Sequence, residues 1–397
     1  MTDVEESSTE RERLVAERFV IPKTALLGRL HTAVAQAAPT AKEAAKIFYE
    51  NLESAFMVAG IPYNFADSSV LMRRHNQIMI SEEIRALKGV QPNEPITEQA
   101  RTEAHIIANQ RFEEELQDER KVDQFNHQIR YDLYVLMQRN DVDRASHDLL
   151  LETVIMVWGS FEVFIADFVR SHLNAYPGIA TRLLTDPSTK ASFDIKSIGI
   201  EDLTANQFNV SNAMGNILVS KRRLDGIEVI RNVLKVMFPH HQQMIQNIST
   251  PELYKLAQRR HLIVHRRGSV DAAYLQKTND NYQIGQTLRL TSEYIYQVIY
   301  LVRDIGIAVL DAVATSPEVS SHDALITYMT TQLPGETAMA TVKNELGLKD
   351  STLKKLKEVL GNTDHPTTTA LRDMGVRYVV RGNGRSARSF LIKDQAA

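Results

Sequence analysis

Residues 259–268 read RRHLIVHRRG and gather four arginines and two histidines around the apolar triplet Leu262, Ile263 and Val264. On a helix, which turns by about 100° per residue, His261 and His265 lie one turn apart on the same face. A histidine near the C-terminus of a helix is favoured in its protonated form, whereas neighbouring arginines favour its neutral form. These opposed effects predict a histidine that titrates near neutrality, as general acid–base catalysis requires.

The arginines of this segment suggest that the substrate contains a phosphate group. A permanently charged, forked guanidinium suits a phosphate oxygen whose charge grows in a phosphoryl transition state. RNA fits better than DNA, because its 2′-hydroxyl is an internal nucleophile that needs only acid–base help and charge stabilisation. Arg260 lies about 140° around the helix from His265. We therefore expect a second copy of the helix to lie across it and to form a shared groove in a symmetric dimer.

Two other interpretations fit the same residues. Histidine and arginine at a helix end are also an ordinary arrangement that stabilises the helix dipole. The spacing in HLIVH suits two zinc ligands, but the metalloprotease pattern has Glu after the first His, where this chain has Leu262, and no third ligand stands out. We therefore expect neither a metal nor another cofactor.

The segment that carries these residues has the signals of a helix. STPEL supplies a cap, Pro251 in the first turn and Glu252 at the positive end of the dipole, and Gly268 supplies a stop. The pattern predicts a helix from about 250 to 267. Apolar periodicity also predicts a core helix from Ser146 as cap to Pro177, and another helix within TSEYIYQVIYLVRDIGIAVLDAV, so residues 146–315 form a helical unit.

The first 140 residues are predicted to be an N-terminal helical region. Its charged part, from Thr97, carries one narrow apolar stripe, which indicates either a surface helix packed on its own core or a dimer seam. The members of the stripe recur at three- and four-residue spacing: Val122, Phe125, Ile129, Leu133 and Leu136.

Composition limits the function classes. The 397 residues are 43% apolar and contain no cysteine, which excludes disulfides, thiolate nucleophiles and iron–sulfur clusters. The first residues, MTDVEESSTERER, are acidic and polar where a signal peptide needs a basic start and an apolar stretch. No apolar run approaches the length of a membrane span. We expect a soluble, cytoplasmic protein that has no membrane partner.

The C-terminal part differs from the rest in charge. Residues 341–397 carry 11 Lys and Arg against 6 Asp and Glu, although the whole chain has a formal net charge of −3. Three short predicted helices, SHDALITYMTTQL, ETAMATVKNELGL and DSTLKKLKEVLGN, precede a predicted hairpin around Gly382. Residues 320–397 therefore resemble a winged helix-turn-helix domain, with STLKKLKEVL as its recognition helix.

This C-terminal domain is predicted to contact phosphates, and it could bind DNA as well as RNA. A solvated basic surface and a protein-binding winged helix are the alternatives. The predicted nucleic-acid-binding residues are Lys354, Lys355, Arg381, Arg385 and Arg388.

The segment RRHLIVHRRGSVDAAYL resembles the signature of HEPN domains (higher eukaryotes and prokaryotes nucleotide-binding): Arg, a polar residue, three further residues and His. Arg260, His261 and His265 fill these places. The aromatic-rich helix before the motif, WGSFEVFIADFVRSHLNAYP, and the turn with Gly268 and Asp271 after it also agree. The resemblance covers residues 146–315 and leaves the N-terminal region and the C-terminal domain outside.

The resemblance implies an up-and-down helical bundle that dimerises so that the two motif helices meet. It further implies a metal-independent endoribonuclease whose products end in a 2′,3′-cyclic phosphate. His265 would be the acid–base residue, Arg260 would stabilise the phosphate, and His261 would orient the substrate. Arg259, Arg266 and Arg267 are predicted to hold the RNA backbone.

The sequence therefore predicts a mainly α protein with a HEPN-type bundle, an N-terminal helical extension and a winged helix-like domain. We expect a homodimeric toxin or anti-phage abortive-infection effector that cleaves RNA and is restrained or triggered by a partner such as an antitoxin. The alternative is a non-catalytic dimeric regulator, in which the helical unit only dimerises and the C-terminal domain binds nucleic acid.

Overall fold

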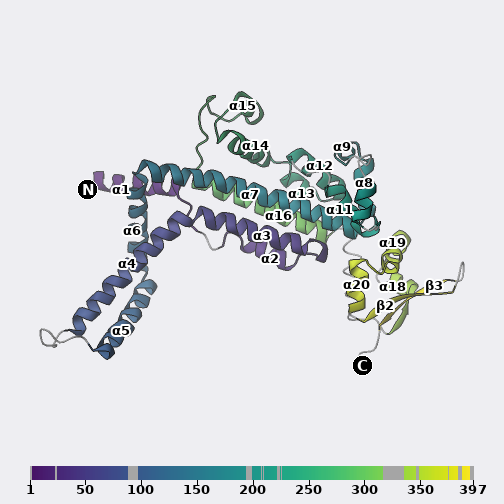
Figure 1. The fold of residues 1–397 in the computed structure, drawn as a ribbon, viewed down its shortest axis with the longest axis horizontal. Helices are drawn as coiled ribbons and strands as arrows, with labels where there is room; N and C mark the ends of the chain where they lie inside the picture. The colour runs from purple at the N-terminus through teal and green to yellow at the C-terminus, as the bar shows by residue number, and fades with distance from the viewer. Residues whose placement is uncertain are drawn as a thin grey trace. The chain divides into compact units, whose positions relative to one another are not determined.

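A computed structural model describes residues 2–22, 25–87, 97–193, 199–206, 208, 210–220, 224, 226–315, 335–345, 348–373, 375–382 and 387–393. The protein is mainly helical, as predicted, with a small antiparallel sheet near its C-terminal end (Figure 1). Contacts group the chain into two compact units, each made of separate stretches. These units do not follow the ranges expected from the sequence, because the long helices α7 (Asn140–Ala175) and α16 (Ser292–Ala314) run through both.

Unit 1 consists of residues 1–26, 51–158 and 258–300. It contains the C-terminal half of the helix with the two histidines, and parts of α7 and α16. Its other described helices are α1 (Thr2–Arg18), the end of α3 (Pro39–Ala59), α4 (Ile61–Ala86), α5 (Glu98–Gln117), α6 (Glu119–Met137), the end of α14 (Pro251–Arg266) and α15 (Ala272–Thr278).

One apolar cluster holds α1, α4 and α6 together in unit 1. Ile129 and Leu133, from the predicted stripe, are buried there against Val15, Phe19 and their neighbours on α4. Leu136 stays 42% exposed. The packing favours the interpretation of the stripe as a helix on its own core.

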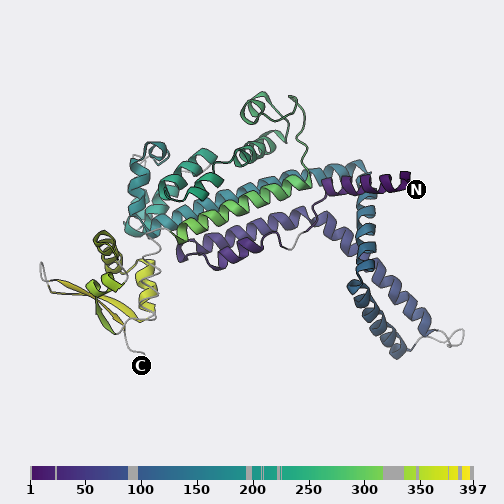
Figure 2. The same ribbon diagram turned by 180° about the vertical axis from the view of Figure 1, so that it is seen from behind.

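The charged segment from Thr97 forms two helices rather than one. Asp118 lies at the break, where its carboxylate accepts a hydrogen bond from the backbone N–H of Arg120 at 2.9 Å and caps α6. Helix α5 lies beside α4 (Figure 2), and Arg74 of α4 forms an ion pair with Glu115 of α5 at 2.5 Å. Buried Glu82 accepts from Arg111 in the same hairpin.

Unit 2 consists of residues 27–50, 159–257 and 301–397. Phe48 of α3 stacks on Phe164 of α7 with ring centroids 4.4 Å apart, and Phe168 continues the stack. The shorter helices of the unit are α2 (Gly28–Ala35), α8 (Gly178–Thr185), α9 (Pro187–Lys190), α10 (Ile200–Ala205), α11 (Val210–Ser220), α12 (Ile227–Met237) and α13 (Gln242–Asn247).

Helix α7 confirms the predicted core helix and extends it. Trp158, Phe161 and Phe164 are buried as expected from their spacing. The helix begins at Asn140 rather than at Ser146, whose hydroxyl donates to the carbonyl of Asp143 at 2.9 Å instead of capping the helix. Among the described helices, α7 alone is long and apolar enough to cross a membrane. More than half of its most apolar stretch, 56%, is buried within the protein, as in a core helix.

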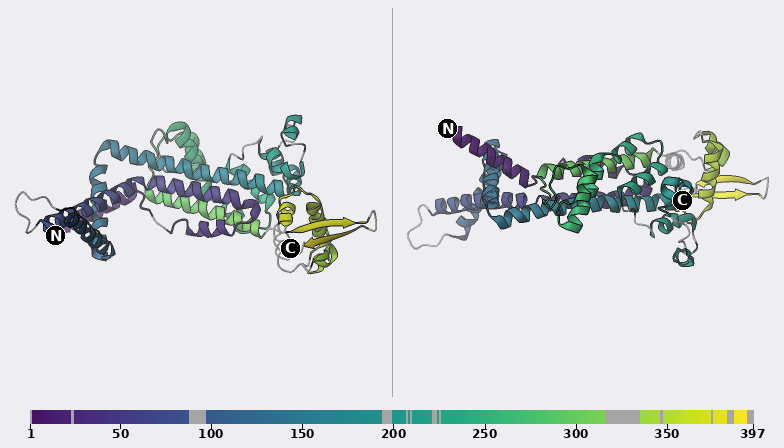
Figure 3. Two further views of the ribbon diagram at one scale, coloured as in Figure 1. Left: turned by 60° about the horizontal axis from the view of Figure 1, so that its bottom comes forward. Right: turned by 90° about the horizontal axis from the view of Figure 1, so that it is seen from above.

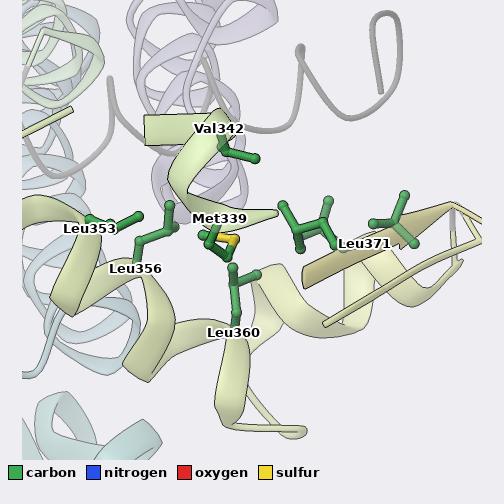
Figure 4. Packing of buried hydrophobic residues seen from close by; sticks show 8 residues of the cluster. Met339, Val342, Leu353, Leu356, Leu360 and Leu371 are labelled. Atoms are coloured by element: carbon green, nitrogen blue, oxygen red, sulfur yellow. The ribbon is translucent and has the colours of Figure 1, made fainter. Parts of the chain in front are cut away.

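The C-terminal part of unit 2 has a core of its own (Figure 4). Helix α18 (Met339–Glu345) supplies Met339 and Val342. Helix α19 (Asp350–Gly361) supplies Leu353, Leu356 and Leu360, and α20 (Pro366–Asp373) supplies Leu371. These side chains pack against Val376 and Leu391 of the sheet.

The predicted hairpin is confirmed by strands β2 (Val376–Arg381) and β3 (Arg388–Lys393), which Figure 3 shows as a long ribbon. A third strand, β1 (Glu336–Ala338), pairs with β3 and gives the order β1-β3-β2. This strand lies where a helix was expected. Helix α20 was not predicted, and it rather than α19 directly precedes the hairpin. The first helix expected in this region, within residues 321–333, lies outside the described residues.

Candidate active site

Helix α14 confirms the predicted motif helix, from Pro251 to Arg266. Leu253, Leu256, Leu262 and Ile263 are buried and anchor one face. The other side of its last turns is open to solvent. After the helix, Arg267 and Gly268 adopt left-handed backbone angles, with φ of 51° and 77°, and the Gly268 N–H donates to the carbonyl of Leu262 at 3.2 Å. Gly268 therefore ends the helix as expected, because glycine adopts left-handed backbone angles with less strain than residues that carry a Cβ atom.

The two motif histidines meet on the open side. The rings of His261 and His265 lie 4.5 Å apart, centroid to centroid, with an interplanar angle of 52°, and both residues are exposed. Partial burial lowers the pKa of His261 from its usual value. The positive charges of His265, Lys277 and Arg260 lower it further, and Asp271 opposes them. The neutral form of His261 is thus favoured at neutral pH, and a neutral imidazole can accept a proton or a hydrogen bond.

Arg260 lies half-buried on α14 directly before His261. Its positive charge is one cause of the lowered pKa of His261. All three predicted catalytic residues lie in the last turns of α14, where the rings of His261 and His265 meet. This arrangement can hold an anion and move a proton beside it.

Arg259 behaves differently from what the sequence predicted. Its guanidinium forms an ion pair with Asp280 at 2.9 Å, and its Nε donates to the hydroxyl of Tyr274 at 3.2 Å. The guanidinium also lies 4.4 Å from the centre of the Tyr294 ring. The Arg259 side chain is only 12% exposed. These contacts make it a structural cation inside unit 1, so we do not retain it among the substrate-binding residues.

Arg266 and Arg267 remain at the surface, but they differ. Arg266 forms an ion pair with Asp271 at 3.0 Å and keeps 54% of its side chain exposed. Asp271 also caps α15 by accepting from the backbone N–H of Tyr274 at 2.7 Å, and this bond is the main cause of its lowered pKa. Arg267 is exposed at the left-handed turn. Both side chains can contact a polyanion, but at Arg266 the polyanion competes with the Asp271 carboxylate.

Lys277 is a further cation whose charge acts on the site and which the sequence does not single out. It lies exposed on α15, which follows the motif helix after a short turn. Its charge acts on the pKa of His261. The motif gives no signal for it, because its place beside His261 depends on how α15 folds back onto α14.

Metal binding gains no support from the described part of the chain, where no three His, Asp or Glu side chains are grouped so that they could hold an ion. A metal at His261 and His265 would need its further ligands from elsewhere.

The predicted nucleic-acid-binding residues of the C-terminal part are mostly at the surface. Lys354 and Lys355 are exposed on α19, and Arg388 is exposed on β3. Arg381 of β2 is also exposed, but it forms an ion pair with Glu336 at 2.7 Å and lies 5.4 Å from the centre of the Phe390 ring. Arg385 lies outside the described residues.

Comparison of the chain with models of known protein families, with curated proteins and with solved structures found no significant match.

Proposed function

We propose that this protein is a metal-independent endoribonuclease of HEPN type that works as a homodimer in the cytoplasm. The observation that carries the proposal is the exposed pair of His261 and His265, with rings 4.5 Å apart, within reach of the charge of Arg260. Histidines that share a cationic surface can exchange a proton with a substrate while the arginine holds its phosphate.

The proposed reaction uses the 2′-hydroxyl of RNA as the nucleophile. His265 takes the proton of that hydroxyl, and the 2′-oxygen forms a bond to the adjacent phosphorus. The bond from phosphorus to the 5′-oxygen breaks, the leaving oxygen takes up a proton from water, and His265 returns its proton to the solvent. The products end in a 2′,3′-cyclic phosphate and a 5′-hydroxyl. Arg260 stabilises the charge that grows on the non-bridging oxygens of the phosphate. His261 orients this phosphate relative to Arg260 and His265.

The surrounding cations support a polyanionic substrate. Arg266 and Arg267 extend the positive surface beyond the histidine pair, where they can hold the RNA backbone. An enzyme that cuts cellular RNA must be restrained until it is needed. We therefore propose a role as a toxin or an anti-phage abortive-infection effector, with an antitoxin or trigger protein as partner.

The C-terminal part supports a second role in nucleic-acid binding. Its antiparallel order β1-β3-β2, with three helices before the hairpin, suits a winged helix-like domain, and Lys354, Lys355 and Arg388 are exposed on it. This domain could hold RNA for the catalytic part or bind DNA. The same observation favours the second candidate function, a non-catalytic dimeric regulator.

Incubation of the purified protein with total RNA in EDTA tests the first proposal. We expect discrete fragments with cyclic-phosphate ends, and no fragments with Arg260→Ala or His265→Ala. His127→Ala is the matched control, because it removes an exposed histidine of α6 in the same unit. If the two site variants cut as well as the control, catalysis by Arg260 and His265 is excluded. Loss of DNA binding on Lys354→Gln/Lys355→Gln, in a protein that leaves RNA intact, favours the regulator.

A further inference from the structure

Two ion pairs hold α15 and the segment just after it against the end of α14. Near its start, Asp271 forms the ion pair with Arg266 at 3.0 Å. Just after its end, Asp280 forms the ion pair with Arg259 at 2.9 Å. The residue order is opposite in the two segments, so α15 runs antiparallel to the last two turns of α14. Figures 1 and 2 show the two helices near each other.

The ion pair of Arg259 and Asp280 is buried and leaves α15 little freedom to shift. Tyr274, on α15, is 4% exposed, and its hydroxyl donates to Asp280 while accepting from Arg259. The Asp280 side chain is 8% exposed. A charge pair that is shielded from water and hydrogen-bonded on several sides tolerates few alternative geometries.

This arrangement brings Lys277 to the histidine pair. Tyr274 faces the interior, and Lys277 lies almost one turn further along α15 with an exposed side chain. Because α15 runs antiparallel to α14, its last turn lies near the start of RRHLIVHRRG rather than near the end. The charge of Lys277 acts on His261, together with those of Arg260, His265 and Asp271.

We propose that Lys277 is a substrate-positioning residue that binds a backbone phosphate next to the one held by Arg260. The inference rests on the proposed ribonuclease function, since it assigns a subsite to the same substrate. Helix α15 then contributes to the RNA-binding surface together with α14, and the RNA strand lies across the ends of both helices. A lysine ammonium suits this task, because it is a compact charge that can follow a flexible strand.

Binding can be measured without cleavage in a His265→Ala protein. A fluorescein-labelled single-stranded RNA is titrated with this protein, and anisotropy is followed at several salt concentrations. We expect Lys277→Gln to weaken affinity by about 3- to 10-fold at low salt. The slope of log affinity against log salt should fall by about 0.7, the value for one phosphate contact on a single strand. Lys277→Arg should restore most of the affinity.

Arg101→Gln is the matched control, because it removes one exposed cation from α5 of the same unit. If Lys277→Gln binds as the control does, or if the His265→Ala protein binds no RNA, the inference is wrong. Cleavage by the His265-containing protein is scored separately. Equal cleavage and affinity in Lys277→Gln and the control reject the Lys277 subsite alone. Lys277-dependent binding by a protein that never cuts RNA rejects the ribonuclease alone.

Discussion

Arg259 and Asp280 form an ion pair at 2.9 Å in which the side chains are only 12% and 8% exposed. The pair joins the helix of the candidate site to the loop after α15. Arg260, the next residue, is the one whose charge reaches His261. Two adjacent arginines of one motif therefore have different tasks, one structural and one in the candidate site.

Removal of one partner of this pair should destabilise unit 1. Arg259→Met leaves the Asp280 carboxylate buried without its cation, so we expect the free energy of unfolding to fall by about 3 kcal/mol. The double variant Arg259→Met/Asp280→Leu removes both charges and should recover most of that loss. Urea unfolding of the single and double variants measures the coupling. Additive effects of the two substitutions would contradict a paired arrangement.

The titration of His261 should respond to its neighbours with opposite signs. Lys277→Gln removes a positive neighbour, so the pKa of His261 should rise. Asp271→Asn removes a negative neighbour but keeps a capping side chain, so the pKa should fall. The Cε1 proton of His261 reports both shifts in an NMR titration. Shifts in the same direction for both variants would show that these charges do not face His261.

The sequence predicts the elements of the site better than their connections. STPEL and Gly268 mark both ends of α14 because capping signals are local, and the predicted 250–267 differs little from Pro251–Arg266. The buried place of Arg259 could not be predicted, because it depends on Asp280 and Tyr294, which folding brings close. Strand β1 escaped prediction because its three residues cannot display an alternating pattern and depend on β3 for pairing.

A buried histidine should make the stability of unit 2 depend on pH. His172 is 0% exposed, among Phe168, Tyr176 and Phe238, and burial lowers its pKa to about 3. In the unfolded chain His172 has its ordinary pKa of about 6.5, so below that pH the unfolded chain binds a proton that the folded chain excludes. The contribution of neutral His172 to the free energy of unfolding is therefore complete above pH 6.5. It is lost as the pH falls from 6.5 toward 3, by about 1.4 kcal/mol per pH unit.

His172→Phe removes this titration and keeps an aromatic ring in the same apolar surroundings. The difference in unfolding free energy between the variant and the original protein should grow in favour of the variant between pH 6 and pH 4. Chemical unfolding at several pH values measures it. A difference that stays constant with pH would mean that folding does not lower the pKa of His172.

Close packing of α16 on α3 allows only glycine at position 306. A Cβ atom there would lie 2.3 Å from the Phe48 ring, so Gly306→Ala should cost about 1–3 kcal/mol of stability. Gly159 of α7 is the matched control, because a Cβ there meets nothing within 4 Å. Gly159→Ala should be neutral or stabilise by up to about 1 kcal/mol. Thermal unfolding compares the two variants, and equal effects would contradict the packing at Gly306.

In the proposed reaction RNA supplies its own nucleophile at the His261 and His265 site. One RNA oligonucleotide is compared with the same oligonucleotide carrying a single 2′-deoxynucleotide on the 5′ side of the cleaved bond, both in EDTA. We predict that the first is cut to a 2′,3′-cyclic phosphate end and that the second stays intact at that bond. Cleavage of the deoxy-substituted bond, or cleavage only when a divalent metal is added, would contradict the account.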